Sequence, residues 1–320
     1  MKSHVNLEIN NQCQLDSVCG ADCILNWYDE LSGKRELMSR EEILGVSREF
    51  SENGRYVSDF AIAGKEPFMT PDLVRDVLSV YYGSSQNDRP NSIGCVTNGL
   101  MIKSRMFDWL ERYPFDWMAF STDFMHGIDI SSKVLDIADE VFKMGGAKTA
   151  HVNTIIYPFE LNRDSEKILD MGRKVSNMDS LSMWTIAPFL RRTVNGLVCS
   201  FSYEDHRIAL DFLIDNFGKD MRVLYDVPFN DFQKIVDEDQ VKVDNWRLEY
   251  DVPDSSITVI SANLSKGKFI RVRYDGSLIF GNVDFNDVER YKSNDRVRYR
   301  SGILRNVLRD YVVSGEVLTV

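Results

Sequence analysis

The sequence predicts an α/β protein, a partial (β/α)6 TIM-like barrel followed by a C-terminal extension rich in antiparallel strands. Up to about residue 187, short β-rich runs alternate with amphipathic helical stretches, as they do in a mostly parallel sheet covered by helices. After about residue 195, runs of alternating polar and apolar residues become frequent, which is typical of antiparallel strands. The two patterns divide the chain into an expected barrel, residues 1–195, and an expected α+β extension, residues 196–320, that covers the barrel opening.

Six short runs in the first part have the character of strands, and helical stretches lie between them. The expected strands are residues 5–9, 56–63, 92–97, 117–121, 150–156 and 181–187. Thr70 and Pro71 supply an N-cap and a proline at the first helical position, so a helix is expected to begin there. Ser39 and Glu42 have the spacing of a capping box, and Gly145 follows a helical run as a C-cap. Six such βα units in succession predict a barrel or partial barrel.

A hairpin is the clearest feature of the second part. Asp275-Gly276 separates two β-rich runs, residues 270–274 and 278–280. An Asp-Gly pair between such runs is a strong signal for a turn that joins antiparallel strands. A helix at 205–216 and a short strand at 221–225 are expected before it.

The charge balance excludes several classes of partner. The chain carries 38 Lys and Arg against 49 Asp and Glu, a net charge of −11, which repels phosphate backbones and anionic membranes. No run of eighteen apolar residues occurs, and no signal-peptide core precedes the first strand. We therefore expect a cytoplasmic protein that binds neither a membrane nor nucleic acid.

Three of the five cysteines follow the first expected strand within eleven residues: Cys13, Cys19 and Cys23. An odd number of cysteines argues against a disulfide framework, and active sites of βα barrels gather at the C-terminal ends of the strands. Three thiolates without a nearby histidine suit a 4Fe–4S cluster that keeps one iron free, whereas a structural zinc normally needs a fourth ligand. Zinc, or no metal, stays open on spacing alone. Cys95 and Cys199 lie in apolar contexts and are expected to be buried structural thiols.

Polar residues also follow the other expected strands. Gly64-Lys65-Glu66-Pro67 follows the second strand, and Asn98 follows the third in Thr97-Asn98-Gly99. Ser121 and Asp123 end the fourth strand, and Asn153 lies on the fifth. Because the C-terminal ends of parallel strands meet at one edge of the sheet, these groups are expected to converge on one mouth.

In the order and type of these motifs, the sequence resembles the radical S-adenosylmethionine superfamily, in particular its peptide-maturing, molybdopterin-synthesis and viperin-like branch. That family has a cysteine triad after the first strand, then Gly-Gly-Glu-Pro, Thr-Asn-Gly, Ser-x-Asp and Val-Asn-Thr on successive strands. The resemblance covers residues 5 to about 189. Two motifs depart from the family: the cysteines are spaced C-x5-C-x3-C instead of C-x3-C-x2-C, and Lys65 replaces the second glycine of the turn.

The resemblance implies one 4Fe–4S cluster on Cys13, Cys19 and Cys23, with S-adenosylmethionine bound at the fourth iron. It implies that the backbone of residues 64–66 contacts the methionyl amino group and that Ser121 and Asp123 lie by the ribose or the methionyl end. It also implies that Asn153 lies near the ribose and that backbone at Ile186 and Ala187 meets the adenine. The implied cofactor-binding residues are Gly64, Lys65, Glu66, Pro67, Asn98, Ser121, Asp123, Asn153, Ile186 and Ala187. No catalytic side chain is implied.

The resemblance implies a radical enzyme of the oxidoreductase class. An electron from a donor such as flavodoxin or ferredoxin would lead to reductive cleavage of S-adenosylmethionine, and the 5′-deoxyadenosyl radical would abstract hydrogen from a peptide or a small metabolite. From Phe201 to Val320 the chain has no cysteine, so a single cluster is expected. Two alternatives stay open: a catalytically inert partner protein of the same ancestry, and a zinc-stabilised α/β protein.

Overall fold

The structure is a computed structural model. It describes residues 2–20, 23, 26, 36–123, 126–157, 165–179, 181–193, 196–217, 222–239, 243–244, 247–249, 257–260, 268–280, 299, 304, 306, 308 and 309.

Strands and helices alternate through the first two thirds of the chain. The strands are β1 (Ser3–Glu8), β2 (Val57–Ala63), β3 (Ser92–Thr97), β4 (Phe115–Ser121), β5 (Ala147–Ile156), β6 (Leu181–Pro188), β7 (Leu190–Thr193), β8 (Gly196–Cys199), β9 (Val223–Asp226), β10 (Val243–Asp244), β11 (Arg247–Glu249), β12 (Ile257–Ile260), β13 (Lys268–Val272) and β14 (Leu278–Phe280). The helices are α1 (Asp16–Cys19), α3 (Arg40–Ser51), α4 (Pro71–Gly83), α5 (Phe107–Arg112), α6 (Ile128–Lys143), α8 (Ser165–Ser176), α9 (Tyr203–Phe217) and α10 (Phe229–Asp239), with 3-10 turns η2 (Pro67–Met69) and η3 (Ser104–Met106).

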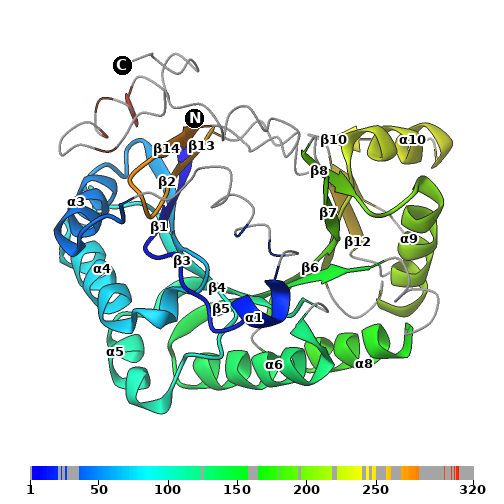
Figure 1. Cartoon of the computed structure of the whole chain (residues 1–320), viewed down its shortest axis with the longest axis horizontal. Coiled ribbons are helices and arrows are strands. Elements are labelled where there is room, and N and C mark those ends of the chain that lie inside the picture. The colour runs from blue at the N-terminus through cyan, green and yellow to red at the C-terminus, as the bar shows by residue number, and fades with distance from the viewer. Residues whose placement is uncertain are drawn as a thin grey trace.

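One curved sheet organises the molecule. Its strand order is β10-β11-β12-β9-β6-β5-β4-β3-β2-β1-β13-β14, and β1 to β6 are parallel neighbours. Figure 1 shows the helices on the outer, convex side of this open wall, whereas the short α1 lies on the concave side. The predicted partial barrel is therefore confirmed, and all six strands expected in its first part are present.

The core lies between the sheet and the outer helices. On β1, Val5 and Leu7 are fully buried and pack with the helices, while Glu8 belongs to the opposite, concave face. On β1, this alternation leaves the polar side chain of Glu8 to the concave face. The concave face is consequently the surface on which a ligand site can form.

The later strands extend both edges of the same wall. The pairs β10/β11, β11/β12 and β13/β14 are antiparallel, as predicted, and β13 and β14 form the expected hairpin. However, β13 pairs in parallel with β1, and β9 pairs in parallel with β6 and β12. The hairpin is therefore part of the barrel wall. The division at residue 195 and the covering role of the extension stay predictions.

Helix ends follow the sequence signals with one exception. The capping box is present: Ser39 Oγ accepts from the Glu42 backbone N–H at 3.2 Å, and Glu42 Oε2 accepts from the Ser39 N–H at 2.7 Å. Gly145 follows α6 with a φ of 73°, as a C-terminal glycine does. The predicted side-chain cap at Thr70 does not form, because η2 precedes the helix and the Thr70 hydroxyl donates to the Pro67 carbonyl at 3.2 Å.

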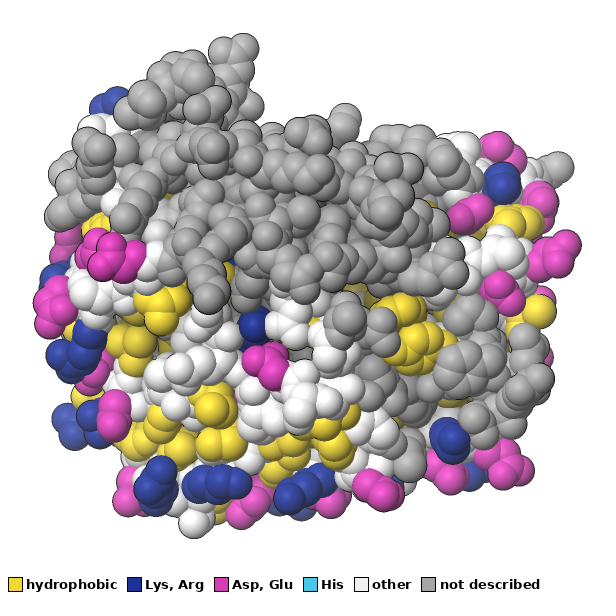
Figure 2. Space-filling model, in the orientation of Figure 1, with side chains coloured by type: hydrophobic (Ala, Val, Ile, Leu, Met, Phe, Trp, Pro, Cys, Tyr) yellow, Lys and Arg dark blue, Asp and Glu magenta, His cyan; other side chains and the backbone are white. Residues whose placement is uncertain are grey.

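Charged side chains of both signs lie around patches of apolar side chains on the visible face (Figure 2). Figure 2 shows Lys and Arg side chains interspersed with Asp and Glu along the outer rim of this face. Within the described residues, no helix has the length and apolar character needed to cross a bilayer.

A buried histidine joins α9, β8, β9 and α10. His206 is fully buried; its Nδ1 lies 2.8 Å from Tyr225 Oη, and its Nε2 lies 3.7 Å from Cys199 Sγ and 3.9 Å from Asp231 Oδ2. Burial lowers the pKa of His206 to about 4, although Asp231 and Asp205 favour its charged form. The imidazole is therefore neutral in the folded protein at neutral pH.

We predict that His206 makes the protein less stable as the pH falls from about 6.5 to about 4. The unfolded state binds the proton more tightly than the folded state there, so about 2–3 kcal/mol of stability is lost by pH 4.5. His206→Gln should lack this loss in urea unfolding measured across that pH range. His4 is the control: a hydrogen bond to Asp59 raises its pKa, so His4→Gln should change the pH dependence in the opposite sense. Identical profiles for wild type and His206→Gln would contradict the assignment.

Candidate functional site

The C-terminal ends of β1, β2, β3, β4 and β5 meet at one edge of the sheet. The register places Glu8 beside Ala63, Thr97 beside Phe120, and Ser121 beside Asn153. The segments that follow these strands therefore share one mouth, as active-site loops do in βα barrels. This arrangement brings together the cysteine loop and the predicted strand-end motifs.

The turn after β2 needs glycine at its first position. Gly64 has a φ of 139°, and a Cβ there would lie 2.9 Å from the Asn10 carbonyl oxygen. Asn10 also donates from Nδ2 to the Glu66 carbonyl at 2.9 Å and to Thr70 Oγ1 at 3.0 Å. The turn is thus held directly against the residue that leads into the cysteine loop.

Glu66 is fully buried and braces the ends of β2 and β3. Its carboxylate accepts hydrogen bonds from Thr97 Oγ1 at 2.7 Å, from the Asn98 backbone N–H at 2.8 Å and from the Phe68 N–H at 3.0 Å. Burial raises the pKa of Glu66 to about 7, against the effect of these three donors. All the contacts are internal, so this side chain supports the turn and its backbone remains the part that can meet a ligand.

Lys65 points toward the cysteine loop. Its side chain is only 10% exposed, and Nζ lies 3.8 Å from Asp16 Oδ2 on α1. The lysine that replaces a glycine of the family motif is thereby directed at α1. The contact joins the turn after β2 to the segment between Cys13 and Cys19.

The three cysteines are half-buried free thiols on the same loop. Cys13 Sγ accepts hydrogen bonds from the Leu15 N–H at 3.3 Å and from Asn98 Nδ2 at 3.5 Å. Burial raises the pKa of Cys13 to about 11 and that of Cys19 to about 12, and the nearby Cys23 and Cys13 add to the shift at Cys19. Each thiol therefore lies within electrostatic range of the other two.

This donor set fits an iron–sulfur cluster by its chemistry. Sulfur ligands are what iron–sulfur clusters require, and N–H donors to a cysteine sulfur stabilise its thiolate form. Within the ranges that the structure describes, which leave out residues 21–22 and 24–25 of this loop, no three His, Cys, Asp or Glu side chains form a ready-made metal site. The cysteine ligand set stays a prediction.

The ends of β4 and β5 carry the next group of predicted residues. Asp123 Oδ1 accepts from the Ile155 backbone N–H at 2.9 Å, and burial raises the pKa of Asp123 to about 7. The Thr122 N–H donates to the Asn153 carbonyl at 2.8 Å, which joins the two strand ends. Asp123 also contributes to the raised pKa of Cys19, so its carboxyl group is near the cysteine loop.

The predicted adenine-contacting residues lie on β6. Ile186 pairs with Thr154 and Ala187 with Ile155 of β5. The Ile186 side chain is fully buried in the helix-side core, so Ala187 belongs to the concave face. Their role in cofactor binding stays a prediction, as do the roles of Pro67, Ser121 and Asn153.

Sequence reasoning missed several contacts at the mouth. Asn10, Gln14 and Asp16 connect the cysteine loop to the turns after β2 and β3. Tyr157 and Phe189 follow β5 and β6, and their rings lie 4.4 Å apart between centroids. Position along the chain was the available signal in the sequence, because each of these polar or aromatic residues lies in a segment that follows a barrel strand.

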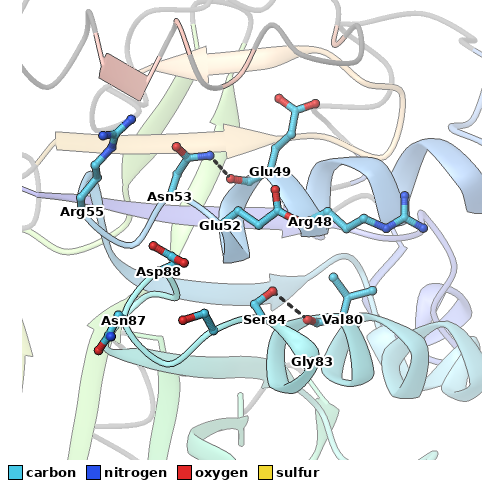
Figure 3. Close-up of a pocket in the computed structure, with 11 residues that line it drawn as sticks. Arg48, Glu49, Glu52, Asn53, Arg55, Val80, Gly83, Ser84, Asn87 and Asp88 are labelled. Carbon is cyan, nitrogen blue, oxygen red and sulfur yellow. Dashed lines mark hydrogen bonds between the residues drawn. The ribbon is translucent and has the colours of Figure 1, made fainter.

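A separate groove of about 930 Å³ lies at the other end of the strands (Figure 3). It is lined by Arg48, Glu49, Glu52, Asn53, Arg55, Val80, Gly83, Ser84, Ser85, Asn87 and Asp88. These residues come from the C-terminal ends of α3 and α4 and from the segments that lead into β2 and β3. The groove is therefore remote from the mouth at which the cysteine loop lies.

Comparison with known proteins identifies the fold. No protein-family model and no curated protein matches the sequence. SuiB from Streptococcus suis matches 98% of this chain with a TM-score of 0.61 and 11% identity. SuiB bound to S-adenosylmethionine matches 98% with a TM-score of 0.58 and 10% identity. The structure of anSMEcpe with bound AdoMet and Kp18Cys peptide matches 99%, with a TM-score of 0.60, 11% identity and 81% of that chain covered.

The chain spans 66% of the length of the SuiB chain in both SuiB structures. At this level of identity the match is one of fold. The chain thus has the open-barrel fold of SuiB and anSMEcpe, two proteins whose solved structures include complexes with S-adenosylmethionine.

Proposed function

We propose that this chain is a radical S-adenosylmethionine enzyme that holds one 4Fe–4S cluster through Cys13, Cys19 and Cys23. The observation that carries the proposal is the position of three thiols on the loop after β1, a loop that Cys13 and Gln14 connect by hydrogen bonds to Asn98 at the end of β3. Solved structures with this fold contain bound S-adenosylmethionine. When bound, the cluster would supply the electron for reductive cleavage of S-adenosylmethionine into methionine and a 5′-deoxyadenosyl radical.

The chain's own residues would bind and orient the cosubstrate. The backbone of residues 64–66, held by Asn10 and by the Glu66 side chain, would meet the methionyl amino group. Ser121, Asp123 and Asn153 would meet the methionyl or ribose end, because they lie at the ends of adjacent strands beside the cysteine loop. The concave wall would exclude water from the radical, which is a general reason for enclosing an active site.

A peptide is the substrate class we propose. One SuiB structure is bound to a precursor peptide, SuiA, and anSMEcpe structures contain Kp18Cys and Cp18Cys peptides. The electron would come from a flavodoxin- or ferredoxin-like donor, and the protein would act in the cytoplasm.

Anaerobic reconstitution with iron and sulfide, followed by reduction with S-adenosylmethionine present, tests the reaction. We expect 5′-deoxyadenosine and methionine as products, detected by liquid chromatography and mass spectrometry. An iron-loaded protein that does not bind S-adenosylmethionine in calorimetry would be an inert homologue. A protein that takes up zinc and no iron would support the zinc-stabilised alternative.

We also predict that Asp123→Ala weakens S-adenosylmethionine binding. A buried polar group of the cosubstrate left without its partner costs about 1–3 kcal/mol, which corresponds to roughly five- to hundredfold in Kd. Calorimetry on the iron-loaded protein measures the change. Asp129→Ala removes an exposed carboxylate from the start of α6 and should leave Kd at the wild-type value. Equal Kd for both variants would remove Asp123 from the binding site.

A further inference from the structure

Asn98 connects the buried Glu66 turn to the cysteine loop. Its backbone N–H donates to Glu66 Oε2 at 2.8 Å. Its side-chain oxygen accepts from Gln14 Nε2 at 2.7 Å, and its side-chain nitrogen donates to Cys13 Sγ at 3.5 Å. One residue after β3 thus contacts two residues of the loop after β1.

The hydrogen-bond pattern determines which end of the Asn98 amide faces the sulfur. Oδ1 also accepts from the Leu100 backbone N–H at 3.1 Å, so two N–H groups point at the same atom. A reversed Asn98 amide would set its own NH2 against the Leu100 backbone N–H, which can only donate, and the Gln14 amide would have to turn over as well. The Asn98 NH2 group is therefore the one that faces Cys13.

Both polar ends of the Asn98 side chain are used within the protein. The amide is directed at Cys13 and Gln14, and the backbone N–H at a carboxylate that is itself held by Thr97 and Phe68. A rigid support of this kind fixes the position of a donor, and fixed N–H donors to sulfur are among the factors that set the reduction potential of an iron–sulfur cluster.

We propose that Asn98 is a positioning residue for the cluster: held by Glu66 and Gln14, it donates an N–H···S hydrogen bond to Cys13 and raises the reduction potential of the bound cluster. This role rests on the proposed function and differs from the cosubstrate contact that the family resemblance implies. The reason is electrostatic, since a donor to the sulfur stabilises the extra negative charge of the reduced state.

The test is a potentiometric titration of the reconstituted full chain, followed by electron paramagnetic resonance without S-adenosylmethionine. Asn98→Leu removes the donor without adding charge, and its cluster should titrate at a more negative potential than that of wild type. Gln14→Leu leaves the Asn98 donor but removes one support, so a smaller shift in the same direction is expected. Asn87→Leu, in an exposed loop, should titrate like wild type.

A wild-type potential in Asn98→Leu, with roughly four iron atoms per chain retained, would overturn the role of Asn98 and leave the proposed function intact. If Asn98→Leu does not retain iron, Gln14→Leu decides: a negative shift supports the positioning role and an unchanged potential overturns it. A wild-type chain that takes up no iron would overturn both the inference and the proposed function.

Discussion

Replacing Cys19 by alanine is expected to abolish the incorporation of iron and sulfide. Cluster ligands must be thiolates that converge on the metal, and loss of one of only three protein ligands removes the site. Wild-type protein reconstituted under the same conditions should hold roughly four iron atoms per chain, the content of one 4Fe–4S cluster. Colorimetric iron and sulfide analysis after desalting measures both values.

Cys199→Ala is the matched control for this experiment. Cys199 is the last residue of β8 and contacts His206 of α9, and it belongs to neither the cysteine loop nor the turns that contact it, so its removal should leave the iron content unchanged. Equal iron in the Cys19 and Cys199 variants would contradict the ligand assignment. A reproducible wild-type content of about eight iron atoms per chain would instead reveal a second cluster.

Replacing Glu66 by alanine is expected to destabilise the protein strongly, even without a cluster. The change leaves the buried backbone N–H groups of Phe68 and Asn98 without their acceptor, at about 1–3 kcal/mol each, or about 2–6 kcal/mol together. The Thr97 hydroxyl loses the same partner. Urea unfolding of the apo-protein, followed by circular dichroism, measures the loss.

Glu41→Ala is the control, because Glu41 is an exposed carboxylate in the first turn of α3. If Glu66→Ala loses as little unfolding free energy as Glu41→Ala, Glu66 does not brace the turn.

The pH dependence of stability gives a second test of the role of Glu66. The pKa of Glu66 is raised from 4.5 to about 7 in the folded state, so wild type loses this contribution to stability as pH rises from about 4.5 to about 7. The difference between wild type and Glu66→Ala should therefore be larger at pH 5 than at pH 8.

Local signals in the sequence were sufficient for most elements. Each of the six barrel strands has hydrophobic residues that fill the helix-side core, and strand periodicity reports that burial directly. The capping box at Ser39 and Glu42 formed because both partners lie within one turn of helix. Thr70 shows where local signals fail to predict a helix cap. Its hydroxyl forms hydrogen bonds with the Pro67 carbonyl of the preceding turn and with Asn10, a residue far away in the sequence.

The sequence predicted which residues belong to the candidate site, but it did not predict the contacts between them. Cys13, Glu66 and Asn98 were recognised from motifs at strand ends, where a ligand face is expected. Their connection through Gln14, and the pairing of Lys65 with Asp16, join segments that are distant in the chain. Such pairs depend on where the strands place the loops, which no local pattern specifies.

The sequence by itself determined the alternation of strands and helices, the clustering of three cysteines after the first strand and the hairpin at Asp275-Gly276, because each depends on neighbouring residues. Only the tertiary structure decided that β9, β12 and β13 join the barrel wall in parallel, and that Asn98 directs its amide at Cys13. Strand partners and donor–acceptor pairs are set by packing of the whole sheet, which brings together groups from β1, β3 and β13 that hydrophobic periodicity cannot pair.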